Sequence, residues 1–139
     1  MSLSRIRISS EATNKLRFLK ARTGLTPNIL CRLAFTLSLN ESGLPSPESY
    51  DEQGQEFNRY TLMGEWDQLF FALLKERLLL DGLDVVQDLA AQFAGHLNRG
   101  VSLLYTRLKT LNDLQELIPT NKMQLVRETS NLDEEATLA

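Results

Sequence analysis

Apolar and polar residues at the start of the chain follow a pattern that predicts a short strand and then a helix. Residues 5–8 read Arg-Ile-Arg-Ile, so a strand would point both arginines to one face and both isoleucines to the other. Ser9 or Ser10 can cap a helix, because a serine hydroxyl accepts a hydrogen bond from the first free amides. An apolar stripe at helical spacing follows, which predicts a helix that runs to about Thr23.

A second helix is predicted directly after the first. Gly24 favours a left-handed exit from a helix, and Thr26-Pro27 combines an N-cap residue with a proline at the first helical position. Apolar side chains then cover most of the helical circumference up to Leu39. A helix that is apolar on so many sides is expected to be largely buried.

The middle of the chain lacks helical periodicity. Residues 40–55 contain glycines, prolines and acids, which are typical of a loop. Residues 56–63 contain Phe57, Tyr60 and Thr61, side chains that favour the half-buried surface of a sheet. They predict a second short strand.

Three further helices are predicted in the remaining chain. The first covers residues 66–78 and ends at Asp81-Gly82. The second is capped by Asp84 and closes at Asn98-Arg99-Gly100, because glycine is a common residue at a helix exit. The third has leucines at helical spacing over residues 102–117.

Together these elements predict a mainly α fold. It is a compact helical domain with a short N-terminal strand followed by two helices, a start like that of ribbon-helix-helix proteins, then a second short strand and three further helices. Residues 1–118 are expected to form this single domain. Pro119 ends the last helix, and residues 119–139 are expected to be a polar, acidic and mobile tail.

The composition is that of an ordinary globular protein. A length of 139 residues suits one domain, and 42% hydrophobic with 24% charged residues excludes a disordered or fibrous chain. No apolar run approaches the roughly 18 residues of a membrane span, and the N-terminus lacks the apolar region of a signal peptide, so we expect a cytoplasmic protein. Cys31 is the only cysteine, which excludes an intrachain disulfide.

The charge is distributed unevenly along the chain. The whole sequence carries −3, but residues 1–39 hold seven basic residues against the single acid Glu11, which gives +6 there and leaves −9 for the rest. Such asymmetry is typical of a protein with one face for a polyanion, although basic side chains on solvated helix faces would also produce it. The candidate DNA-binding residues are Arg5, Arg7, Lys15, Arg17, Lys20, Arg22 and Arg32.

A basic strand followed by two helices is the layout of the β-ribbon DNA readers. In these proteins two chains pair their strands, and the outward side chains enter the major groove. Arg5 and Arg7 would be those side chains in this chain. The free amides at the start of the second helix, residues 27–30, could in addition receive a phosphate.

The first helix offers a different kind of contact. Lys15 and Arg22 share one flank of its apolar stripe, and Arg17 and Lys20 lie on the other flank. Two rows of positive charge suit the phosphates of a duplex, and each neutralised phosphate releases counterions, so the affinity would depend strongly on salt.

Other candidates for chemistry are weaker. Cys31 lies in the apolar second helix, where a cysteine is usually a small core residue. His96 is the sole histidine and cannot build an ordinary zinc site without further ligands. The scattered glycines never form a phosphate-binding GxxxxGK[ST] loop. We therefore predict no catalytic residue, no metal site and no cofactor.

Two stretches of the sequence resemble a known family. The run RIRISSEATNKLRFLKARTGLTPNILCRLAFTLSLNE, residues 5–41, and the run HLNRGVSLL, residues 96–104, are similar to the DndE family of DNA sulfur-modification proteins. The resemblance implies a compact helical protein that forms a homotetramer and binds double-stranded DNA, preferentially nicked, through a positive surface. It also implies an accessory role beside sulfurtransferase-type and ATPase subunits, without catalysis by the chain itself.

The resemblance favours contacts with the DNA backbone over sequence reading. A partner that recognises general or nicked duplex needs mainly phosphate contacts, whereas a ribbon in the major groove reads bases. Two alternatives stay open: a ribbon-helix-helix transcriptional regulator, and a structural helical subunit that never contacts DNA. Sequence-specific protection of DNA would favour the regulator, and an absence of salt-sensitive binding would favour the structural subunit.

Overall fold

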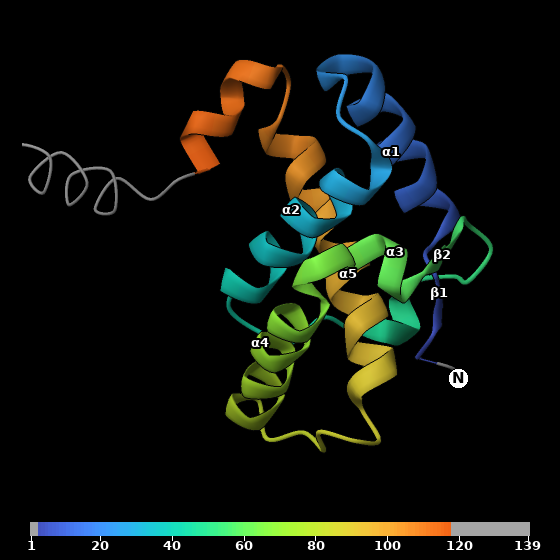
Figure 1. Ribbon diagram of the computed structural model, residues 1–139, viewed down its shortest axis with the longest axis vertical. Helices are drawn as coiled ribbons and strands as arrows, with labels where there is room; N and C mark the ends of the chain where they lie inside the picture. The colour runs from blue at the N-terminus through green and yellow to red at the C-terminus, as the bar shows by residue number, and fades with distance from the viewer. Residues whose placement is uncertain (1–2, 118–139) are drawn as a thin grey trace, which may run out of the picture.

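The N-terminal strand pairs with a second strand of its own chain. The computed structural model describes residues 3–117 (Figure 1). In it β1 (Arg5–Arg7) pairs antiparallel with β2 (Glu56–Asn58), and Ile6 lies opposite Phe57. Ile6 and Phe57 are buried, while Arg5 and Arg7 are exposed, as the alternation predicted. Pairing of β1 with β2 differs from the β-ribbon arrangement, in which this strand would pair with a second chain.

The two predicted N-terminal helices are both present at the predicted positions. In α1 (Ser10–Thr23), the Ser9 hydroxyl caps the start by accepting a hydrogen bond from the Ala12 amide. Gly24 ends this helix with a φ of 75°, in the left-handed region. The next helix, α2 (Pro27–Asn40), begins with the proline.

The second predicted strand is shorter than the sequence indicates. It stops at Asn58, because the Asn58 side chain accepts hydrogen bonds from the amides of Tyr60 and Thr61 and so caps a helix. The residues that follow form the short helix α3 (Arg59–Met63). The prediction of a strand over residues 56–63 is therefore correct for its first three residues and wrong for the rest.

The other elements of the structure are shorter connections and two long helices. The loop before β2 contains the 3-10 turn η1 (Pro47–Ser49), and η2 (Gly64–Trp66) joins α3 to α4. The helix α4 (Asp67–Leu80) ends before Asp81 and Gly82, as predicted. The last two are α5 (Leu89–Arg107) and the 3-10 helix η3 (Leu111–Leu117).

The long helix α5 contradicts a predicted boundary. A helix end was expected at Asn98-Arg99-Gly100, but α5 continues through all three residues. Gly100 is there for packing: an added Cβ would collide with the backbone carbonyl of Ala34 in α2. The predicted cap Asp84 binds the amides of Val86 and Gln87, which form a turn before the helix begins at Leu89.

The predicted last helix is also different. Residues 102–107 belong to α5, and residues 111–117 form η3 instead of a continuing α-helix. The predicted stop at Pro119 and the predicted tail over residues 119–139 lie outside the described residues. None of the helices within residues 3–117 is long and apolar enough to cross a membrane.

The core lies between α2 and α5, which cross in the middle of the molecule (Figure 1). Phe35 of α2 is fully buried and meets Phe93 of α5 edge-on at 5.3 Å and Phe70 of α4 at 5.8 Å. The predicted burial of α2 is correct for Cys31, Ala34 and Phe35, but Ile29 is exposed. Helix α1 packs against both α5 and α2 and presents its polar face to solvent.

Candidate nucleic-acid interface

The two strand arginines lie on the exposed face of the sheet and share one carboxylate. Arg5 and Arg7 approach Glu56 of β2 at 3.9 and 3.8 Å. Arg7 also donates a hydrogen bond to the Gly54 carbonyl at 3.1 Å. Since one acid faces both arginines, their positive charge is partly compensated within the chain.

One flank of α1 forms a basic cluster around an aromatic ring of α5. The side-chain cations of Lys15, Arg22 and Lys109 lie 5.6, 4.6 and 5.2 Å from the centre of the Tyr105 ring, distances at which cation–π attraction operates. Lys15 also pairs with Glu11 at 2.9 Å. The structure thus brings Lys15 and Arg22 together as predicted, and adds Lys109 and Tyr105, which the sequence analysis missed.

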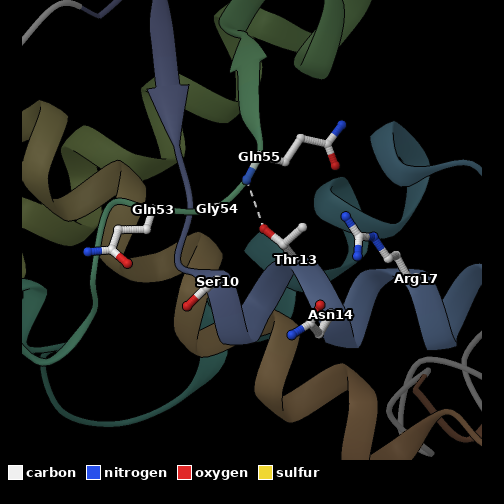
Figure 2. Close-up of a pocket in the computed structure, with 7 residues that line it drawn as sticks. All are labelled: Ser10, Thr13, Asn14, Arg17, Gln53, Gly54 and Gln55. Atoms are coloured by element: carbon white, nitrogen blue, oxygen red, sulfur yellow. Dashed lines mark hydrogen bonds between the residues drawn. The ribbon is translucent and has the colours of Figure 1, made fainter.

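The other flank of α1 carries the cations that have no competing contact. Arg17 and Lys20 are exposed, and within residues 3–117 neither side chain forms an ion pair, a hydrogen bond or a ring contact. Arg17 lines an open polar cavity of about 420 Å³ between α1 and the loop that leads into β2 (Figure 2). Ser10, Thr13, Asn14 and residues 53–55 complete its lining.

The wall of this cavity is held in place by the first turns of α1. The Thr13 hydroxyl accepts a hydrogen bond from the Gln55 amide at 2.8 Å (Figure 2). It also donates one to the Ser9 carbonyl at 2.9 Å. The Gly54 amide donates to the Ile8 carbonyl at 2.9 Å. A Cβ at Gly54 would collide with the Ser9 carbonyl and the Thr13 hydroxyl, so only glycine fits this approach.

Arg32 differs from the other predicted DNA-binding residues because its guanidinium binds two backbone carbonyls of α3. Its Nε donates to the Leu62 carbonyl at 2.6 Å, and Nη2 donates to the Thr61 carbonyl at 3.4 Å. These contacts satisfy the free carbonyls at the end of α3. Arg32 lies on α2 and not on α1, and it is half-buried.

The sole histidine and Arg99 belong to a buried polar network instead of the exposed surface. The Ser38 hydroxyl lies 2.8 Å from His96 Nδ1 and accepts a hydrogen bond from Arg99 Nε, also at 2.8 Å. Arg99 and Arg77 both donate to the Gly43 carbonyl, which anchors the loop after α2. Burial, together with the nearby Arg99 and Arg77 charges, lowers the pKa of His96 to about 4.

This histidine should make the stability of the protein depend on pH. His96 stays neutral in the folded state down to about pH 4, whereas in the unfolded chain it takes up a proton below about pH 6.5. The unfolded state therefore binds more protons in this window, and the free energy of unfolding should fall as the pH falls, by up to about 1.4 kcal/mol per pH unit. Urea unfolding from pH 7.5 to 4 measures this slope. His96→Gln should show a flatter slope between pH 6.5 and 4.5, and equal slopes for both proteins would contradict the assignment.

Cys31 is a core residue, as predicted. It is fully buried, and burial raises the pKa of its thiol to about 12, so the nucleophilic thiolate is disfavoured at neutral pH. Among residues 3–117 no group of histidine, cysteine, aspartate or glutamate side chains is arranged to hold a metal ion.

The fold and the cations of α1 define a class of protein: a small helical protein with a strand-helix-helix start and a basic helix on its surface. The family model described as DNA sulphur modification protein DndE matches residues 5–112. This chain therefore belongs to the DndE family, and the resemblance seen in the sequence is confirmed.

Two solved structures are similar to this chain. DndE from Escherichia coli B7A, involved in DNA phosphorothioation modification, is 31% identical, with a TM-score of 0.61 over 75% of this chain and 98% of that chain. A mutant of DndE involved in DNA phosphorothioation is 29% identical, with a TM-score of 0.59 over 75% of this chain and 99% of that chain. A comparison with curated proteins finds no match.

Proposed function

We propose that this protein is a non-catalytic DNA-binding subunit of the machinery that introduces phosphorothioates into DNA. Membership in the DndE family supports a role in DNA phosphorothioation. The observation that supports DNA contact is the state of Arg17 and Lys20, two exposed cations on one flank of α1 that have no partner within residues 3–117. A cation without an internal partner can neutralise a phosphate without first losing an ion pair.

The candidate DNA-binding residues differ in how available they are. Arg17 and Lys20 are the primary contacts in this proposal. Lys15 and Arg22, with Lys109 beside them, form a second contact around Tyr105, whose ring holds the cations in place. Arg22 contributes most to this second contact, because Glu11 partly compensates the charge of Lys15.

The remaining three cations contribute less in this proposal. Arg5 and Arg7 add little while Glu56 compensates them. Arg32 would have to give up its hydrogen bonds to the Leu62 and Thr61 carbonyls before it could bind DNA, so we assign it to the fold.

The contacts proposed here are with the sugar-phosphate backbone of double-stranded DNA. Lysine and arginine on a helix flank can follow a phosphate row without reading bases. A preference for nicked duplex, a homotetrameric state, and an association with the sulfurtransferase-type and ATPase subunits are part of the same proposal, and family membership supports them. So is the division into a DNA-binding domain over residues 1–118 and a tail over 119–139.

Binding of a random-sequence duplex at increasing salt tests this function. The wild-type protein should bind with an affinity that falls steeply as salt rises, and Lys20→Glu should weaken binding of every sequence and reduce the salt slope by about 1. Lys75→Glu is the matched control, because Lys75 is also an exposed helical lysine but lies on α4.

The other outcomes separate the alternatives. Strong protection of one sequence over random duplex would favour a transcriptional regulator. No salt-sensitive binding at all would contradict the proposed function and favour a structural subunit. An unchanged slope in Lys20→Glu would exclude Lys20 as a phosphate contact.

A further inference from the structure

Phe18 is the one large apolar side chain of α1 that lies in solvent. Leu16 and Leu19, close to it along the helix, are fully buried or nearly so, whereas Phe18 is 57% exposed. It lies off the apolar stripe of α1, so packing of the core does not explain a phenylalanine at this position. A single exposed apolar side chain needs no function by itself, and the surroundings of this ring therefore decide its role.

The ring of Phe18 lies beside the basic cluster around Tyr105. The two ring centres are 6.5 Å apart, and the rings meet edge-on at an angle of 62°. Tyr105 is partly buried and packs against the core. One aromatic ring therefore supports the other, and more than half of Phe18 stays accessible to a ligand.

Two cations flank Phe18 along the same side of α1. Lys15 precedes it by three residues and Arg22 follows it by four, spacings that place the three side chains in one row on a helix. A helix rises by about 10 Å over the seven residues from Lys15 to Arg22. The two long side chains can therefore reach phosphates on either side of a flat group that rests on the Phe18 ring.

The charge around this ring is positive. The cations Lys15, Arg22 and Lys109 outnumber the nearby carboxylates, which are Glu11, paired with Lys15, and Asp113, which accepts a hydrogen bond from the Lys109 amide. Arg22 forms no ion pair with any residue between 3 and 117. The centre of a protein interface is normally depleted of charge. An aromatic ring among cations suits a polyanion that has flat apolar groups.

We propose that Phe18 and the basic cluster around Tyr105 bind an unpaired nucleotide of DNA, with its base stacked on the Phe18 ring. This inference rests on the proposed function, because it adds a second kind of DNA contact to the phosphate contacts of α1. Proteins that hold single-stranded nucleic acid combine cations for the backbone with aromatic rings on which bases stack. Phe18 supplies the ring, and Lys15 and Arg22 supply the cations.

The site should select DNA by the pairing state of its bases. Inside a duplex each base is covered on both faces by its neighbours, so the Phe18 ring can stack only where a nucleotide is unpaired. A nick by itself leaves every base paired, and the site should therefore favour a gap or a displaced strand. Every base has an aromatic face, so the site should accept any sequence.

Comparison of a gapped duplex with a fully paired duplex of the same random sequence tests the site. The gapped duplex lacks a few nucleotides of one strand. The wild-type protein should bind it roughly tenfold more tightly, a factor that stacking of one base on an aromatic ring can supply. Phe18→Leu keeps an apolar side chain but removes the ring, so it should bind both duplexes with similar affinity. Phe18→Trp restores a ring and should retain the preference.

Tyr60→Leu is the matched control. Tyr60 is also 57% exposed, and its ring lies 5.0 Å from the cation of Arg59, but it belongs to α3. Tyr60→Leu should therefore keep the preference for the gapped duplex. Circular dichroism checks that each variant is folded, and the salt slope for paired duplex should be the same in Phe18→Leu as in the wild type, because no cation is removed.

A photoreactive base provides a second reading in the wild-type protein. With 5-iodouracil in the unpaired part of the gapped duplex, irradiation should crosslink the DNA to the peptide that contains Phe18. Equal affinity of the wild type for both duplexes, a preference that survives in Phe18→Leu, or crosslinks confined to other peptides would overturn the site. Salt-sensitive binding of paired duplex would persist in each of these cases if the proposed function is correct, and its absence would contradict that function instead.

Discussion

Reversing the charge of Arg17 and Lys20 together should reduce the affinity for duplex DNA about a hundredfold or more. Each contact between a cation and a phosphate is worth roughly 1.5–3 kcal/mol, so the loss of two gives a drop of this size. The log-log salt slope should also fall by about 2, because two fewer counterions are released per bound protein. Fluorescence anisotropy with a labelled random duplex at several salt concentrations measures both quantities for Arg17→Glu/Lys20→Glu.

Two comparisons make this result specific to α1. Lys75→Glu changes the net charge in the same direction on α4 and should alter the affinity only slightly. Arg5→Glu/Arg7→Glu removes two cations that Glu56 already compensates, so its effect should be smaller than that of the α1 pair. If net charge, and not the flank of α1, determined binding, the two double variants would lose the same affinity, and Lys75→Glu would lose about half as much in free energy.

Gly100→Ala should lower the free energy of unfolding by roughly 3 kcal/mol, even though alanine is intrinsically better than glycine in a helix by about 1 kcal/mol. The added methyl group would collide with the carbonyl of Ala34, and backbone atoms cannot rotate out of the way as a side chain can. Helices α2 and α5 would have to separate along the contact that forms the core. Urea unfolding followed by circular dichroism measures the change.

Gly95→Ala in the same helix is the matched comparison. There a Cβ would lie 3.3 Å from the ring of Pro45 in a loop, which can shift by a few tenths of an ångström. Helix propensity and this mild crowding should nearly cancel, so we expect a change of less than about 1 kcal/mol. If Gly95→Ala were as destabilising as Gly100→Ala, close packing against Ala34 would not be the reason for Gly100.

The start of the fold could be predicted because its signals are local. The alternation of Arg5 to Ile8, the serine cap before α1, and the Gly24 exit followed by Pro27 each depend on a few neighbouring residues. The same holds for the end of α4 at Asp81-Gly82. In each case the residue type that favours the local backbone conformation occurs at that position of the sequence.

One error occurred where a distant contact gives a residue its role, and another where a local signal was overlooked. Gly100 was interpreted as a helix end, because nothing near it in the sequence indicates that the Ala34 carbonyl packs against it. Asn58 was included in a strand, although as an N-cap residue it was a local signal for the start of α3 that we did not use.

The candidate site was predictable in part for the same reason. Helical spacing alone placed Lys15 with Arg22 and Arg17 with Lys20. It could not show that Tyr105 and Lys109, more than eighty residues from Arg22, complete the first cluster. Nor could it separate Arg17 and Lys20 from Arg32, whose guanidinium is bound to α3 carbonyls. Whether a cation is free to bind DNA depends on its tertiary contacts, and the helical periodicity of the sequence does not reveal these contacts.

Photo-crosslinking from single positions tests DNA contact by α1 most directly. The only native cysteine, Cys31, is buried with a raised pKa, so a thiol-reactive crosslinker should attach mainly at an introduced cysteine. With the crosslinker at Lys20→Cys, the protein should form a covalent adduct with random duplex DNA, and with the crosslinker at Lys75→Cys it should form little or none. Efficient crosslinking from position 75 with none from position 20 would contradict the account.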